Sequence, residues 1–223
     1  MSDEDPMTSR YDATGVEAEF EPGSRGRVLR NLCGITGVRA MQFAESRALE
    51  TVEETLLSRF DAGHRFRASD VCLIHRLWLG DLYQWAGEYR NVNIAKGGFM
   101  FAAAQQVPRL MDELEARYLH SLTPCAGMDE AALVAALART HAELVIVHPF
   151  REGNGRCARL LAWLMALQAG LPPLDFSALQ GRGKHPYIAA IHAAFSGNYE
   201  PMETLFSRVV RQTLRAYGQE SLP

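Results

Sequence analysis

The sequence predicts an all-α fold, a helical bundle that contains one short β-hairpin. Two observations predict it: apolar residues recur at helical spacing through most of the chain, and one segment, 88–101, instead places extended residues on both sides of a glycine pair. The composition supports a folded domain, because 48% of the residues are apolar and 22% are charged. At 223 residues, the chain is long enough for one sizeable core and short for two.

The hydrophobic pattern begins only after a polar N-terminal stretch. Residues 1–25 are rich in acidic residues and end in a Pro-Gly-Ser sequence, and they lack the basic start and apolar core of a secretory signal. We therefore predict a mobile extension over residues 1–25, a single domain over residues 26–217 and a short tail over residues 218–223.

The elements follow in order from the spacing of their apolar side chains. Arg39–Phe60 and Ser69–Leu82 are predicted as amphipathic helices, and Ser69 is the expected N-cap of the second. Glu88–Phe101 is predicted as the hairpin, with its turn at Lys96-Gly97-Gly98. A loop is expected at residues 119–127. The helices expected after the hairpin are Gln106–Tyr118, Asp129–Val147, Arg156–Ala169, Pro186–Phe195 and Pro201–Tyr217.

Helix ends are marked by residues suited to them. Asp129 can cap the N-terminus of its helix, and Gly170 can end the following one. Pro108, Pro186 and Pro201 each fall in a first turn, where the missing N–H is tolerated.

Charge and cysteine content exclude several classes of protein. The 23 Lys and Arg against 26 Asp and Glu give a net charge of −3, so no positive field favours nucleic acid as a partner. Cys33, Cys72, Cys125 and Cys157 form no CxxC pair, which argues against a zinc site or a disulfide framework. No apolar stretch approaches the roughly 20 residues of a membrane span. We expect a cytoplasmic protein and leave secretion as an effector open.

One loop between two predicted helices concentrates reactive residue types. It reads His148-Pro149-Phe150-Arg151-Glu152-Gly153-Asn154-Gly155-Arg156, and Arg159 follows on the same helix. Glycines let backbone N–H groups approach an anion, and a helix N-terminus carries partial positive charge. Two arginines three residues apart can face one phosphate chain. Each residue alone is more typical of ordinary structure, and it is their combination that favours a phosphate site.

Two further residues of the loop have the chemistry that phosphate transfer needs. Glu152 is a single carboxylate in a phosphate-binding setting, which suits Mg²⁺. His148 ends the preceding helix, and histidine is the residue type best suited to accept a proton near neutral pH. Cys157 is close enough to raise the alternative of thiol catalysis, but a buried structural cysteine is the expectation.

The loop resembles the signature of the Fic family, H-P-F-x-[D/E]-G-N-G-R-x-x-R, at every defined position. The resemblance extends from about residue 23 to residue 211: the segment Gly80–Gly87 is similar to the one that leads to the family's flap, and Asn93–Phe101 resembles the flap hairpin itself. It implies a Fic-type helical bundle with the flap beside the active-site loop.

The resemblance implies a protein adenylyltransferase that moves AMP from ATP to a Tyr, Thr or Ser hydroxyl of a target protein. His148 would be the catalytic base, Glu152 would hold Mg²⁺, and Phe150 would anchor the loop in the core. The residues implied to bind the nucleotide and its phosphates are Gly153, Asn154, Gly155, Arg156 and Arg159 in the loop, Lys96 and Gly97 in the flap, and Tyr187 near the adenine.

The flap is expected to dock the target. The exposed edge of a hairpin can pair with an extended segment through main-chain hydrogen bonds, which tolerates varied targets. The residues expected to form this docking flap are Asn93, Ile94, Gly98 and Phe99.

The resemblance also raises the question of regulation. Many Fic proteins are restrained by a helix with the pattern [S/T]-x-x-x-E-[G/N], whose glutamate pairs with the second loop arginine, here Arg159. Segments ending at Glu50 and Glu200 come close, but neither completes the pattern. We therefore expect an antitoxin-like partner to supply the glutamate, which makes the chain a toxin or effector. The alternatives are transfer of another nucleotide or phosphate-containing group, and a non-catalytic docking module.

Overall fold

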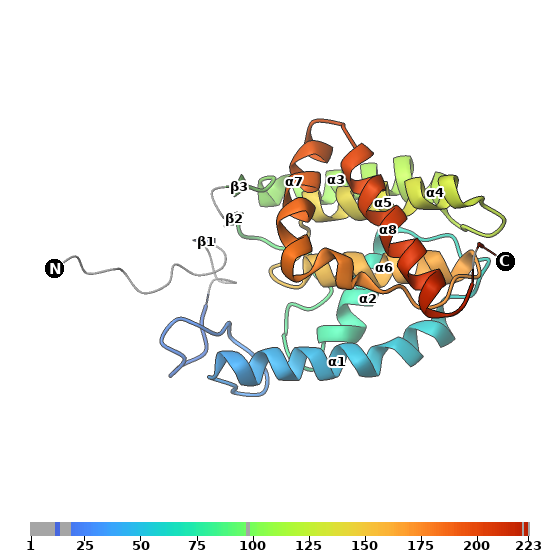
Figure 1. The fold of residues 1–223 in the computed structure, drawn as a ribbon. Helices are drawn as coiled ribbons and strands as arrows, with labels where there is room; N and C mark the ends of the chain where they lie inside the picture. Colours follow the sequence, from blue (N-terminus) through green and yellow to red (C-terminus); the bar gives the residue numbers. More distant parts are fainter. Residues whose placement is uncertain (1–11, 14–18, 97–98, 220, 223) are drawn as a thin grey trace.

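In the computed structural model, which describes residues 12–13, 19–96, 99–219 and 221–222, the chain is a helical bundle with a small sheet at one end (Figure 1). This confirms the predicted fold class. The helices are α1 (Val38–Arg59), α2 (Ala68–Leu79), α3 (Val107–Leu114), α4 (His120–Leu122), α5 (Glu130–Val147), α6 (Asn154–Gln168), α7 (Lys184–Phe195) and α8 (Glu200–Ala216). The strands are β1 (Asp12–Ala13), β2 (Ile94–Lys96) and β3 (Phe99–Met100).

The core surrounds α5 and α6. Helix α5 packs most extensively against α6 and α8, and α2 lies between α6 and α1 (Figure 1). Eleven of the fifteen residues of α6 are buried, because neighbouring helices cover it on several sides. An aliphatic and alanine-rich sequence is therefore needed around the whole of this helix and not only along one stripe.

The predicted helix ends need two corrections. Ser69 is not the N-cap of α2, because the helix begins one residue earlier. Instead the carboxylate of Asp70 accepts from the backbone N–H of Arg67 at 2.9 Å, and Glu115 accepts from that of Ala68 at 2.7 Å. These two acidic side chains satisfy donors that would otherwise be left open at the start of the helix.

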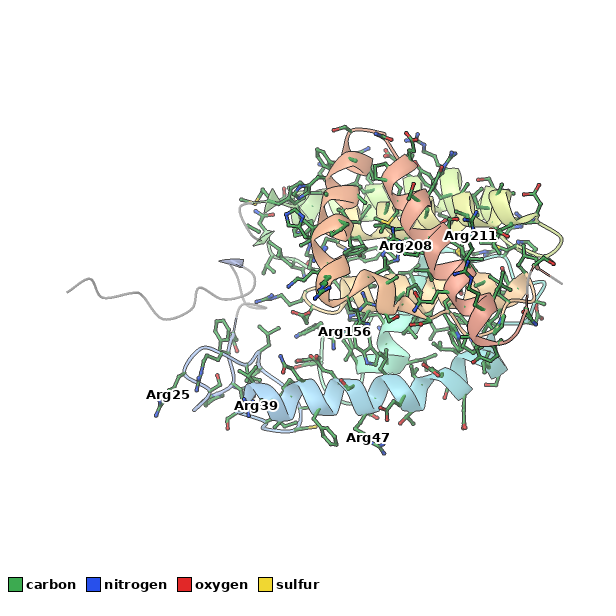
Figure 2. All side chains as sticks on the ribbon, viewed as in Figure 1. Arg25, Arg39, Arg47, Arg156, Arg208 and Arg211 are labelled. Atoms are coloured by element: carbon green, nitrogen blue, oxygen red, sulfur yellow. The ribbon has the colours of Figure 1, made fainter. Side chains whose placement is uncertain are left out.

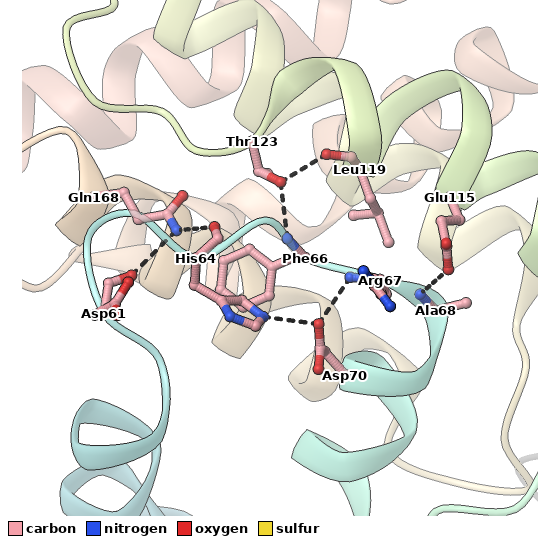
Figure 3. A network of polar contacts seen from close by, with 10 residues as sticks. All are labelled: Asp61, His64, Phe66, Arg67, Ala68, Asp70, Glu115, Leu119, Thr123 and Gln168. Carbon is pink, nitrogen blue, oxygen red and sulfur yellow. Dashed lines mark hydrogen bonds and ion pairs between the residues drawn. The ribbon is translucent and has the colours of Figure 1, made fainter.

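The second correction concerns the loop expected at residues 119–127. After α3 the chain continues through a π-helical turn, Glu115–Leu119, into α4, so the helical path ends at Leu122. Leu119 is fully buried, which favours continuation. Figure 3 shows how Thr123 then closes the end: its hydroxyl donates to Leu119 O and accepts from Phe66 N.

The predicted hairpin is confirmed, and a third strand joins it. The sheet order is β1-β2-β3, and both pairings are antiparallel. In the register of β1 on β2, Asp12 lies opposite Ala95 and Ala13 opposite Ile94. A strand of two residues in a polar segment has no sequence signal, since alternation needs more residues to be seen. The limits of the N-terminal extension stay a prediction.

Candidate active site

The loop that carries the sequence signature joins α5 to α6. His148 is the residue after α5 and adopts a left-handed conformation, with φ of 53°. Gly153 precedes α6 and is also left-handed, with φ of 83°. The two special conformations turn the chain sharply at both ends of the loop. Asn154 braces the bend, because its side-chain amide accepts from Phe150 N and donates to Phe150 O, both at 2.8 Å.

The imidazole of His148 is held from two sides. Its Nδ1 lies 3.0 Å from the carbonyl oxygen of Val145, which can only accept, so Nδ1 carries a proton and, in the neutral ring, Nε2 carries the lone pair. The ring of Phe101, from the flap, stacks on the imidazole at 3.7 Å between centroids. His148 is only 4% exposed. The tautomer is the one that a base acting through Nε2 requires.

Gly153 is needed because no other residue fits. A Cβ at this position would lie 2.8 Å from the ring of Trp78, on α2, and the left-handed backbone disfavours any other L-residue. A glycine N-cap also has no side chain to cover the first N–H groups of α6. The start of α6 therefore presents backbone donors and the positive end of the helix dipole.

His75, on α2, contacts the loop and holds it in place. The sequence analysis did not identify this residue. Gly87 N donates to its Nδ1 at 2.9 Å, so Nε2 bears the proton and donates to Glu152 O at 3.1 Å. Its ring stacks on fully buried Phe150 at 3.9 Å between centroids. Burial lowers the pKa of His75 to about 4, with a smaller effect from the positive charge of Arg156. The ring is therefore neutral, and its role is to position the loop.

Arg156 points from α6 toward α1 (Figure 2). Its Nη1 lies 2.7 Å from a carboxylate oxygen of Glu45, a nearly buried residue of α1, and its guanidinium lies over the ring of Trp78 at 4.7 Å. The other oxygen of Glu45 accepts from the hydroxyl of Tyr83 at 2.7 Å. Glu45 is a second residue of the site region that the sequence did not indicate. The glutamate of this helix that came close to the inhibitory pattern without completing it was Glu50, an exposed residue paired with Arg47 at 3.1 Å.

Arg159 lies one turn further along α6, near a partly buried polar pair. The hydroxyl of Tyr187, on α7, is 2.9 Å from Nε2 of His141, on α5. Burial lowers the pKa of His141 to about 3, and the charge of Arg159 adds to this effect. Burial also raises the pKa of Tyr187 to about 12. The structure thus brings Tyr187 toward the second arginine of the loop, and its expected place near an adenine stays a prediction.

The flap residues lie in different surroundings. Asn93 is exposed, and its side chain accepts from Ala104 N at 3.0 Å. Ile94 is fully buried, so only its backbone faces the sheet edge, where β1 pairs with it. Phe99 packs its ring on His192 of α7 at 5.5 Å between centroids. Lys96 ends β2, and Gly97 and Gly98 lie outside the described residues.

Glu152 can hold a divalent cation only if other groups supply the remaining ligands. Its Oε1 accepts from Gly153 N at 3.0 Å and lies 3.6 Å from Nη2 of Arg156. Within the described part of the chain, three or more His, Cys, Asp or Glu residues nowhere gather to form a metal cage. A single carboxylate suits Mg²⁺ if phosphate oxygens and water supply the other ligands. Thiol chemistry is disfavoured, because burial raises the pKa of Cys157.

A cavity of about 970 Å³ lies elsewhere on the protein. It is lined by α8 residues such as Arg208 and Arg211, labelled in Figure 2, and by Glu130 at the start of α5. His148 follows the other end of α5, about 25 Å away at a rise of about 1.5 Å per residue. This cavity is therefore not part of the loop site.

None of the described helices is both long and apolar enough to cross a membrane.

Comparisons with known proteins agree with the family that the sequence of the loop indicates. The family model described as Fic/DOC family matches residues 65–166. The protein adenylyltransferase VbhT of Bartonella schoenbuchensis is 30% identical over 185 residues, which are 81% of this chain and 37% of that protein. The probable protein adenylyltransferase Fic of Escherichia coli K12 is 30% identical over 144 residues, 62% of this chain and 67% of that protein. The chain thus spans well under half of some relatives.

Solved structures are similar over most of the chain. The BepC protein of Bartonella tribocorum, a VirB-translocated effector with bound AMPPNP, has a TM-score of 0.66 and 26% identity, over 81% of this chain and 91% of that chain. The N-terminal Fic domain of a putative cell filamentation protein from Bartonella quintana, with bound ADP, has a TM-score of 0.68 and 26% identity, over 85% and 92%.

Proposed function

The chain belongs to the Fic/DOC family, and from this premise we propose that it is a protein adenylyltransferase, which transfers AMP from ATP to a hydroxyl of a target protein. Relatives that share about 30% identity are named protein adenylyltransferases. Two structural neighbours bind AMPPNP and ADP, which supports ATP as the substrate here.

One observation carries the proposal. A histidine with its lone pair on Nε2 stands in the same six-residue loop as a glycine-opened helix N-terminus. A base and an anion site at this spacing are what transfer of a phosphate-containing group to an alcohol requires.

In the proposed reaction, His148 Nε2 takes the proton of the target hydroxyl as that oxygen attacks the α-phosphorus of ATP. The new O–P bond forms, the bond between the α- and β-phosphates breaks, and pyrophosphate leaves. The first N–H groups of α6, with Gly153, Asn154 and Gly155, stabilise the negative charge on the phosphates. Arg159 and Arg156 are proposed to contact the β/γ end, although Arg156 must share its charge with Glu45.

Glu152 is the residue proposed to hold Mg²⁺. When bound, the ion would supply positive charge that offsets the negative charge of the phosphates. The side chain is already oriented by Gly153 N, which leaves its second oxygen for a ligand. Because the protein would supply one carboxylate, we expect the ion to bind together with the nucleotide and weakly without it.

The target is proposed to dock at the flap through its backbone. Asn93, Ile94, Gly98 and Phe99 are the residues proposed for this surface. Because β1 already pairs with β2 at this edge, an extended target segment would have to displace β1 before it could pair with the main chain of β2. Ile94 is buried, so its side chain would not contribute to specificity there.

A further part of the proposal is that a partner protein inhibits the enzyme. Glu50 and Glu200 are both exposed, and neither lies in a complete inhibitory pattern. We propose that an antitoxin-like protein supplies a glutamate toward Arg159, and that the chain acts as a toxin or effector in a cytoplasm. If the isolated chain were silent and Glu50→Gly or Glu200→Gly activated it, restraint in trans would be wrong.

The reaction is tested by labelling. Purified chain and a cell lysate are incubated with ATP labelled at the α-phosphate or at the γ-phosphate, and His148→Ala is the matched control. Transfer of the α label only, with at least a 100-fold loss in the His148→Ala variant and little change in nucleotide binding, is expected. Transfer of the γ label would indicate a kinase. No transfer, with unchanged biological effects of His148→Ala, would indicate a docking module.

A further inference from the structure

The side chain of Arg90 connects the flap to the catalytic loop. Arg90 lies just before β2 and is 2% exposed. Its guanidinium donates to three backbone carbonyls: Nε to His148 O at 2.7 Å, Nη1 to Val92 O at 2.8 Å and Nη2 to Ala102 O at 2.6 Å. Its backbone N–H donates to Pro149 O at 2.8 Å. One residue therefore forms hydrogen bonds to two consecutive residues of the loop and to the segments on both sides of the flap hairpin.

These carbonyls belong to two parts of the chain, the flap hairpin and the catalytic loop, that lie far apart in sequence. Val92 precedes β2 and Ala102 follows β3, so they are the two roots of the hairpin, whereas His148 lies 58 positions from Arg90. The guanidinium is a planar, rigid fork whose donors point in fixed directions. Three bonds from one fork therefore fix the two roots of the flap and the backbone of His148 at set distances from one another.

A second contact joins the same two parts. Phe101, the neighbour of Ala102, stacks on the imidazole of His148. The arginine therefore holds the backbone of the base and the backbone beside the ring that covers the base. A displacement of the flap would change both contacts together.

We propose that Arg90 is a positioning residue that couples the flap to His148, so that a target docked on the flap is presented at a fixed distance from the base. The inference rests on the proposed function, because it assigns the flap to the target and His148 to proton transfer. Such coupling matters because a misplacement of about 1 Å of a reacting group can cost about 100-fold in rate. Binding of ATP, which the start of α6 is proposed to hold, depends on it much less.

The test compares Arg90→Lys with Gln168→Leu. Lysine keeps the charge but is a single ammonium on a flexible stem, and it cannot hold three carbonyls in fixed directions. Gln168 is a matched control, because this buried side chain also joins backbone groups of separate segments. It accepts from Cys125 N at 3.1 Å and donates to His64 O at 2.6 Å, and Figure 3 shows the second of these bonds. Both variants lose stability, and both are assayed at a temperature where they are folded.

The expected result separates positioning from stability. Arg90→Lys lowers kcat for AMP transfer by about 10- to 100-fold and raises KM for the target, while KM for ATP stays within about twofold. Gln168→Leu lowers the melting temperature without this pattern. Equal losses of kcat in the two variants, compared at the same folded fraction, would overturn the proposal.

A readout that needs no activity guards against failure of the proposed function. Amide hydrogen exchange is measured on the flap, residues 93–96 and 99–101, and on the loop, residues 148–153. Arg90→Lys should accelerate exchange in both segments together, by about tenfold or more, and Gln168→Leu in neither. Acceleration confined to one of the two segments would refute the coupling, even if the wild-type chain transferred no AMP.

Discussion

Two buried neutral histidines should make the protein sensitive to mild acid. The pKa of His75 is about 4 and that of His141 about 3, both lowered mainly by burial from an ordinary value near 6.5. Between about pH 6 and pH 4 the unfolded chain binds a proton at each histidine and the folded protein does not. Protonation therefore favours unfolding as the pH falls. Each histidine costs about 1.4 kcal/mol per pH unit, so the pair costs about 3 kcal/mol per unit, a large part of a typical stability of about 5–15 kcal/mol.

The measurement is guanidinium unfolding at pH 7.5, 6.5, 5.5 and 4.5 for the wild type, His75→Gln and His141→Gln. Both variants should be less stable than the wild type at pH 7.5, because glutamine replaces only part of each ring's packing. Each deficit should then shrink by about 1.4 kcal/mol per pH unit below about pH 6, since the variants have lost one proton-binding group. Carboxylates titrate alike in all three proteins and cancel in the difference. A deficit that stays constant with pH would refute the reasoning.

Two further predictions concern contacts around the site. Glu45→Ala should destabilise the protein by about 3 kcal/mol, because it removes the nearer carboxylate from the largely buried charge of Arg156 and leaves only the 3.6 Å contact with Glu152. Glu50→Ala on the same helix should change stability by less than about 0.5 kcal/mol, and chemical denaturation compares the two variants. Deleting residues 1–18 should free the edge of β2, so that a fluorescent peptide of residues 8–18 binds the shortened chain severalfold more tightly than the full chain in a polarisation assay. Equal affinities would mean that β1 does not compete for this edge.

The sequence was sufficient for the parts of the site that are contiguous. His148, Gly153 and Asn154 fall within one run of nine residues, and the helices on both sides have strong apolar periodicity, so their order and approximate ends could be predicted. The left-handed backbone at Gly153 follows from the same run, since glycine is the residue that adopts it without strain.

The supporting residues could not be predicted, because each acts across a large separation in sequence. Glu45 meets Arg156 over 111 positions, His75 meets Glu152 over 77, and Arg90 meets His148 over 58. In the sequence, Glu45 reads as a solvated helix residue and His75 as an ordinary core histidine. Only the packing of α1 on α2, and of α2 on α6, makes them part of the loop's support. A buried charge or a histidine in an apolar helix is the one local signal that a distant partner exists.

The flap covers one face of the His148 ring, so a target hydroxyl has to reach Nε2 from the edge of the ring. Phe101 lies nearly parallel to the imidazole, with 19° between the planes, and so covers a ring face. The lone pair of Nε2 lies in the ring plane, so a hydroxyl must approach the ring edge and not the covered face. Because His148 as a whole is only 4% exposed, residues at that edge must move aside as the target docks, and the site then excludes water. The stack and the Val145 bond fix the tilt of the ring during this exchange, which is why the backbone anchor at Arg90 has to hold the flap and the base as one unit.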